Sequence, residues 1–194
     1  MRSAWLRMSL LMIIAVVLQG CVNAAMTGAQ TVYNHKSIQK NLKDEYITLQ
    51  AYKALNIDDK RFKDANISIA TYNGDVLLAG QAPEYWQRDS AEKIVKKIPD
   101  VTQVYNFVKV ASPSSTLTRI SDAWITTKVK SKFLASEDLD ATQIKVVTED
   151  GTVYLMGILT PDDASEAADI ASETDGVLRV VKIISYMKIS KHLV

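Results

Sequence analysis

One stretch of this sequence occurs twice, and it constrains the fold more than any other feature. The segment 72–80 reads YNGDVLLAG, and the segment 149–157 reads EDGTVYLMG. Each begins with an Asn-Gly or Asp-Gly turn, which favours a β-hairpin because glycine accommodates a positive φ. Each continues as a β-prone apolar run that closes on Gly80 or Gly157, and these glycines lie 77 positions apart. The chain is therefore an internal duplication.

The segments around each hairpin predict the same order of elements, α-β-β-α-β. Alternating residues at 65–69 and 142–146 predict the first hairpin strand. A second helix, at 84–98 or 162–174, and a last strand, at 101–110 or 177–187, follow each hairpin. The helix before each hairpin has apolar residues at i, i+4 and i+8, namely Ile47, Ala51 and Leu55 or Ile125, Val129 and Phe133. We expect an α+β fold in which two helices cover one face of a three-stranded mixed sheet in each copy.

Four glycines receive structural roles in this scheme. Gly74 and Gly151 supply the turns of the two hairpins. Gly80 and Gly157 end the second hairpin strand, where we expect an added side chain to meet the helix that crosses above.

The N-terminus has the pattern of a bacterial lipoprotein signal. Arg2 and Arg7 precede an apolar run at 8–17, which is followed by Leu-Gln-Gly and then by Cys21, the sole cysteine of the sequence. The run is long enough for a signal peptide but too short for a permanent transmembrane helix. We therefore expect a covalent lipid on Cys21 and no other cofactor. Val22 follows instead of the aspartate that retains lipoproteins in the inner membrane, so we expect an outer-membrane location facing the periplasm.

The expected organisation is a signal peptide at 1–20, a lipidated tether at 21–37, a first domain at 38–111, a linker at 112–116, a second domain at 117–187 and a tail at 188–194. Because the linker is so short, we expect the domains to touch. Removal of Arg2 and Arg7 would leave 21 of the 23 basic residues against 22 acidic ones. A nearly neutral exported protein is a poor candidate for nucleic-acid binding.

The repeated order and its paired glycines resemble the BON (bacterial OsmY and nodulation) domain. The matching stretches are WITTKV at 124–129, YLMG at 154–157 and ADIAS at 168–172. The similarity covers nearly the whole chain and is stronger in the second copy. Two such domains behind a lipoprotein signal are similar to the dual-BON outer-membrane lipoproteins. That resemblance implies binding of anionic phospholipid, notably phosphatidylglycerol, through the opening helix of the second domain.

The sequence offers no constellation for catalysis. The two histidines, His35 and His192, fall in the tether and the tail, and Cys21 is assigned to the lipid. Acidic pairs, as at 58–59 and 162–163, suit solvated loops or helix starts better than a metal site. We therefore expect a protein that is not an enzyme and holds no metal.

The opening helix of the second copy carries an unusual outer face. At about 100° per residue, Ile120 and Trp124 project away from the predicted core. An aromatic anchor with aliphatic neighbours and lysines at its border suits an anionic lipid surface. The residues predicted to bind lipid are Trp124, Thr127, Lys128, Lys130, Ser131 and Leu134.

Packing of this outer face on the first domain is the alternative interpretation. The equivalent face of the first copy carries Leu42, Tyr46 and Leu49 but has no basic border. We therefore expect the first copy to bury its apolar stripe against a neighbour and the second copy to meet lipid.

These observations favour a non-enzymatic outer-membrane lipoprotein that binds anionic phospholipid and supports envelope integrity. Relatives of this kind also suggest a role at the division site. The alternative is a periplasmic adaptor that docks onto outer-membrane assembly or division proteins, with Trp124 as a protein hot spot.

Overall fold

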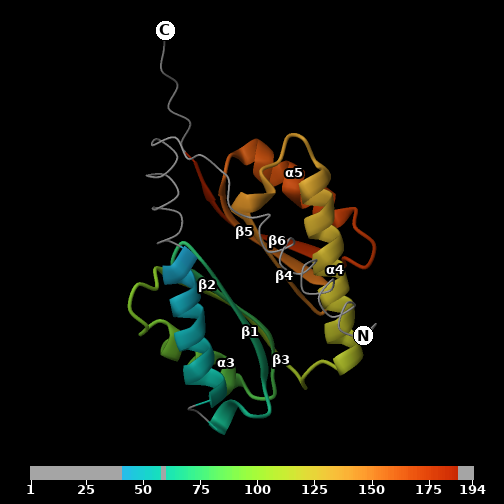
Figure 1. The fold of residues 1–194 in the computed structure, drawn as a ribbon. Coiled ribbons are helices and arrows are strands. Elements are labelled where there is room, and N and C mark those ends of the chain that lie inside the picture. Colours follow the sequence, from blue (N-terminus) through green and yellow to red (C-terminus); the bar gives the residue numbers. More distant parts are fainter. Residues whose placement is uncertain (1–40, 58–59, 188–194) are drawn as a thin grey trace, which may run out of the picture. The chain divides into compact units, whose positions relative to one another are not determined.

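The computed structural model describes residues 41–57 and 60–187, and these described residues belong to one compact unit. The predicted signal peptide, the lipidation site Cys21, the tether and the tail at 188–194 lie outside the described residues. Within the described part, each half of the chain contains one three-stranded sheet (Figure 1).

The first half contains the predicted α-β-β-α-β order. A helix at 41–52 continues into a π-helical turn, η1 (Lys53–Ile57), and a short 3-10 turn, η2 (Lys60–Phe62), follows the gap. The other elements are β1 (Asn66–Tyr72), β2 (Asp75–Ala82), α3 (Tyr85–Val95) and β3 (Gln103–Val110). Strand β2 is central, because it pairs antiparallel with β1 and parallel with β3.

The second half repeats this arrangement. Its elements are α4 (Thr116–Ala135), η3 (Ala141–Gln143), β4 (Ile144–Glu149), β5 (Thr152–Leu159), α5 (Pro161–Ser172) and β6 (Arg179–Tyr186). The sheet order is β4-β5-β6, with an antiparallel and a parallel pair as in the first half. The predicted α+β class and the mixed sheets are thus confirmed.

Each hairpin closes with a two-residue turn in which both residues have a positive φ. The values are 53° and 82° for Asn73 and Gly74, and 50° and 67° for Asp150 and Gly151. This conformation fits the right-handed twist of the flanking strands, which is why Asn-Gly and Asp-Gly are favoured there.

A buried aspartate on each opening helix binds the hairpin turn. The Asp44 carboxylate accepts from the amides of Asn73 (2.6 Å) and Gly74 (2.9 Å). The Asp122 carboxylate accepts from the amides of Asp150 (2.8 Å) and Gly151 (2.9 Å). These contacts fix the opening helix against its own sheet in both halves.

The helices and the sheet of each half enclose one hydrophobic core. The predicted helix positions are all buried: Ile47, Ala51 and Leu55 in the first half, and Ile125, Val129 and Phe133 in the second. Alternate residues of the central strand face the same core, including Val76 and Leu78 in β2 and Val153 and Leu155 in β5. One face of each sheet is therefore covered by its own helices.

The opposite faces of the two sheets share a third core. Leu77 and Ala79 of β2 pack in one cluster with Tyr154 and Met156 of β5. The rings of Phe107 and Tyr154 lie 5.3 Å apart between centroids. The expected contact between the domains exists, but it uses the sheets and not the outer faces of the opening helices.

The expectation for the repeat glycines was wrong in one respect. A Cβ at Gly157 would lie 2.8 Å from the carbonyl oxygen of Gln143, and one at Gly80 would lie 2.1 Å from the carbonyl oxygen of Asn66. The obstacle is the backbone at the start of the neighbouring strand and not the crossing helix. Gly80 also has a φ of 113°, which side-chain-bearing residues rarely adopt.

Candidate functional site

The candidate site lies on α4, a helix of 20 residues and hence about 30 Å long. Its N-terminus is capped by Ser115, whose side chain accepts a hydrogen bond from the Thr118 amide (3.1 Å). Ile125, Val129 and Phe133 hold one side of the helix in the core, and Asp122 ties its first half to the hairpin turn. The opposite side of α4 is thereby presented on a rigid support.

Four large apolar side chains on α4 are exposed, and we call them the α4 stripe. Their exposed fractions are 78% for Leu117, 57% for Ile120, 66% for Trp124 and 74% for Leu134. Exposed apolar groups that gather on one helix face mark an interaction site more often than single ones do. The alternative in which Trp124 packs on the first domain is therefore wrong for this chain.

Thr127 and Ser131 are also exposed, so both lie on the surface as predicted. The Thr127 hydroxyl donates to the carbonyl oxygen of Ala123 at 2.9 Å. Its lone pairs stay available to a hydrogen-bond donor from outside the helix.

The lysines of α4 lie along different borders of the stripe. The Lys128 ammonium donates to the Asp175 carbonyl, and the Lys132 ammonium donates to the Glu173 carbonyl at 2.9 Å, so both reach the segment after α5. Lys130 is exposed and lines a hollow together with Lys145 and residues of the first domain. Among the described residues, no carboxylate lies within 4.0 Å of the Lys128, Lys130 or Lys132 ammonium groups.

The stripe of the first copy is exposed as well. Leu42, Tyr46 and Leu49 on the 41–52 helix have exposed fractions of 65%, 55% and 60%. The expectation that the first copy buries this stripe is not met within the described residues. A charge at Tyr46 is therefore not expected to destabilise the fold, because that ring is not buried.

Sequence reasoning missed part of this surface and of its support. Leu117 belongs to the stripe and lies seven residues, about two turns, before Trp124, so helical periodicity could have identified it. Asp44 and Asp122 occupy equivalent positions in the two copies, because each lies three residues before the first core isoleucine of its helix. This equivalence was also detectable in the sequence.

No metal site is assembled from the described residues. They contain no group of three or more His, Cys, Asp or Glu side chains that could hold a metal ion. His35, His192 and Cys21 fall outside them. No helix between residues 41 and 187 has the length and apolar character needed to cross a membrane.

The chain belongs to the BON domain family, because the family model matches it twice, at residues 43–112 and 121–188. The BON domain is a non-enzymatic module of binding and envelope proteins, so no catalytic family is indicated.

Known relatives place the chain more closely. It is 34% identical over 186 residues to the outer membrane lipoprotein DolP of Haemophilus influenzae, which covers 93% of this chain and 96% of the relative. It is 36% identical over 153 residues to the 21 kDa hemolysin of Actinobacillus pleuropneumoniae, covering 79% of each. It is 31% identical over 143 residues to the osmotically-inducible protein Y of Escherichia coli, covering 72% and 71%. The predicted resemblance to dual-BON lipoproteins is thus confirmed, and the chain is DolP-like.

Proposed function

We propose that this protein is an outer-membrane lipoprotein that binds anionic phospholipid through α4 and supports envelope integrity. It faces the periplasm and is held by a covalent lipid on Cys21. Its similarity over almost the full length to an outer membrane lipoprotein supports the location. The exposed α4 stripe with lysines at its borders supports the lipid contact.

The single observation that carries the proposal is the exposure of Trp124 among aliphatic side chains on a helix whose other side is buried. An indole ring is favoured at the boundary of headgroups and acyl chains, because it is apolar and still donates a hydrogen bond. Lys128 and Lys130 then reach the phosphate level, where each basic residue near an anionic surface contributes about 1 kcal/mol. The helix lies in the plane of the membrane surface.

Because the lipid on Cys21 holds the protein at the membrane, a weak contact between α4 and the bilayer is sufficient to place the helix on the membrane surface. An attached anchor keeps α4 within a tether length of the bilayer, so the second contact forms at a high effective concentration. One strong anchor and one weak, charge-dependent contact together allow the domains to bind and leave the surface without leaving the membrane.

Vesicle co-sedimentation of matched variants tests the proposal. Trp124→Glu places a charge where the ring meets lipid, and we expect at least a tenfold loss of binding to phosphatidylglycerol vesicles. Tyr46→Glu alters the equivalent exposed position of the first copy, and we expect little change. Both variants should melt like the wild type because neither side chain is buried. Equal binding by Trp124→Glu and the wild type would contradict the proposal.

The adaptor function is the second candidate, and the exposed stripe of the first copy favours it, because that stripe lacks a basic border. In this alternative Trp124 is a hot spot for an outer-membrane assembly or division protein. Binding that does not distinguish phosphatidylglycerol from phosphatidylcholine vesicles would favour the adaptor. A role at the division site stays a prediction that localisation in dividing cells can test.

A further inference from the structure

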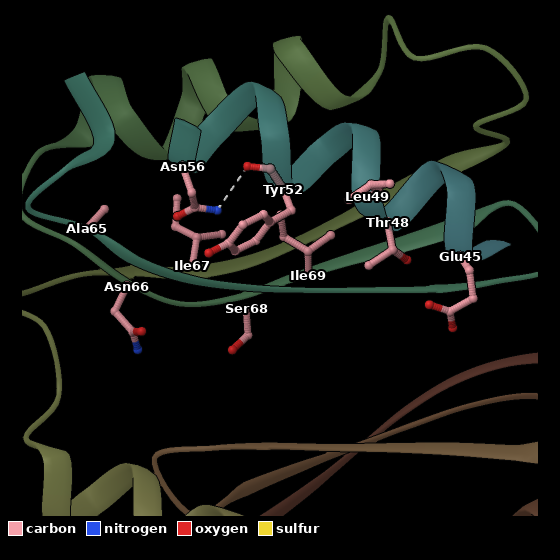
Figure 2. A pocket seen from close by; sticks show the side chains of 10 residues that line it. All are labelled: Glu45, Thr48, Leu49, Tyr52, Asn56, Ala65, Asn66, Ile67, Ser68 and Ile69. Carbon is pink, nitrogen blue, oxygen red and sulfur yellow. Dashed lines mark hydrogen bonds between the residues drawn. The ribbon is translucent and has the colours of Figure 1, made fainter. Parts of the chain in front are cut away.

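The first domain contains an open groove between the 41–52 helix and the edge strand β1. Its volume is about 530 Å³. Figure 2 shows that Ile67 and Ile69 of β1 point toward the helix, where Tyr52 lies over them, while Asn66 and Ser68 point the other way. The residues that line the groove are Glu45, Thr48, Leu49, Tyr52, Asn56, Ala65, Asn66, Ile67, Ser68 and Ile69.

The backbone of β1 is free for pairing along this groove. Strand β1 lies at the edge of the sheet order β1-β2-β3. Tyr72 and Asp75 flank the two-residue turn and form a hydrogen-bonded pair. In an antiparallel ladder, hydrogen-bonded and non-hydrogen-bonded pairs alternate, so the backbones of Ala70, Ser68 and Asn66 also bond to β2. The peptide groups of Ile67, Ile69 and Thr71 therefore point to the outer edge. The Lys145 ammonium donates to the Thr71 carbonyl at 2.9 Å, which agrees with this assignment.

The second copy has the equivalent groove, and there it adjoins polypeptide. A smaller hollow of about 300 Å³ is lined by Lys130, Thr142, Ile144 and Lys145, which are equivalent to Tyr52, Ala65, Ile67 and Ser68. The remaining lining of that hollow comes from the first domain: Asn41, Asp44, Glu45, Thr71 and Tyr72. The groove of the second copy is thus bordered by polypeptide of the first domain. The groove of the first copy is lined by its own domain alone.

The open groove continues an existing interface. The Ser68 hydroxyl donates to the Glu149 carboxylate of the second domain, and Lys145 contacts Thr71 farther along β1. Strand β1 therefore already contacts the second domain from Ser68 onward, and its groove extends this contact surface toward Ala65.

The lining defines the chemistry of the occupant. Of the ten described residues around the groove, Glu45 alone carries a charge. Leu49 and Tyr52 are exposed by 60% and 51% and form an apolar wall. Glu45 also lies 3.7 Å from the Lys145 ammonium of the second domain. The lining itself presents no basic group that would attract anionic lipid or an acidic peptide. It suits an extended chain that pairs with an edge strand and inserts alternate apolar side chains.

We propose that this groove binds an extended segment of another protein, which adds to the sheet as a strand beside β1. The segment is neutral or basic and has apolar side chains at alternate positions. Its backbone bonds to the peptide groups of Ile67 and Ile69, and its apolar side chains contact Leu49 and Tyr52. This site is separate from the α4 stripe and does not depend on the lipid-binding proposal.

Selection from a phage library of random linear 12-residue peptides tests the proposal, with the full chain in detergent as the target. We expect enriched peptides with alternate aliphatic or aromatic residues and no net negative charge. In the complex with a synthetic selected peptide, hydrogen exchange at the Ile67 and Ile69 amides should slow at least tenfold. Leu49→Asp and Tyr52→Glu should weaken peptide binding at least tenfold, and Trp124→Glu should leave it unchanged.

Several results would overturn this inference. They are a selection that enriches nothing above an unrelated target, peptides that bind Leu49→Asp as well as the wild type, and protection at α4 in place of β1. Displacement of the peptide by phosphatidylglycerol vesicles would assign the groove to lipid. A dimer of the full chain that Leu49→Asp dissolves would assign it to a second copy. Hydrogen exchange at the Ile67 and Ile69 amides is measured on the wild-type protein, so it tests the proposal even if a variant loses its fold.

Discussion

At the scale of single residues, the buried aspartates explain how a domain of this size holds its opening helix. Asp44 and Asp122 are 7% and 5% exposed, and each accepts two backbone amides at a hairpin turn. A threonine one turn later adds a second tie, because Thr48 bonds to Thr71 (2.8 Å) and Thr126 bonds to Thr148 (2.7 Å). Sequence reasoning missed these residues because a lone acid on a helix usually faces solvent, and only the equivalent position of the two acids in the two copies distinguishes them from such surface residues.

Removal of one such carboxylate should be costly. We expect Asp122→Ala to lower the free energy of unfolding by about 2–4 kcal/mol, because two buried amides lose a charged acceptor. Asp169→Asn, at an exposed position of α5, is the control and should change it by less than about 0.5 kcal/mol. Urea denaturation measures both. A loss below 1 kcal/mol in Asp122→Ala would mean that water replaces the carboxylate at the turn.

At the scale of elements, the helix cores could be predicted and the contact between the sheets could not. The i, i+4, i+8 spacing identified Ile125, Val129 and Phe133, which are 4%, 0% and 1% exposed. Strand β5 is buried on both faces, and its unbroken apolar run Val153–Met156 is typical of such a strand. That run shows that both faces are covered, but it does not reveal which surface covers the second one. The choice between domain packing and a free helix face therefore required the structure.

The lysines beside the α4 stripe should give lipid binding its charge dependence. We expect the double change Lys128→Gln and Lys130→Gln to weaken binding to phosphatidylglycerol vesicles roughly 30-fold, from about 1 kcal/mol per charge. Its residual binding should vary less with salt than that of the wild type. Lys93→Gln with Lys97→Gln removes two charges around the end of α3 and serves as the control. An equal loss in both double variants would indicate attraction by net charge and not by α4.

At the scale of the whole molecule, the two domains are joined by an apolar core and by one buried acid. Glu149 at the end of β4 is 7% exposed, and one of its carboxylate oxygens has no hydrogen-bond partner in the described structure. Burial raises the pKa of Glu149. The Ser68 hydrogen bond and the Arg119 charge oppose this rise, while the Asp122 and Asp150 charges add to it. The folded protein is therefore more stable, relative to the unfolded chain, when Glu149 is protonated.

This shift predicts a pH-dependent stability. Because the folded state holds the proton more tightly than the unfolded chain, the stabilisation is complete below the ordinary glutamate pKa of 4.5 and is lost as the pH rises through the raised pKa. Glu149→Gln should therefore raise the melting temperature at pH 7 and should match the wild type near pH 4. Glu137→Gln, in an exposed loop, should show no such trend. A Glu149→Gln variant that is less stable than the wild type at pH 7 would contradict the assignment.

The central claim is that α4 meets anionic lipid through Trp124, and the fluorescence of that residue tests it most directly. The sequence contains Trp5, Trp86 and Trp124, so residues 22–194 with Trp86→Phe retain Trp124 alone. This protein also lacks the lipid on Cys21, which leaves binding to the folded domains. With phosphatidylglycerol vesicles we predict a blue shift of the emission and quenching by lipids brominated near the top of their acyl chains, and neither with phosphatidylcholine vesicles. Emission that stays unshifted and unquenched with phosphatidylglycerol would contradict the account.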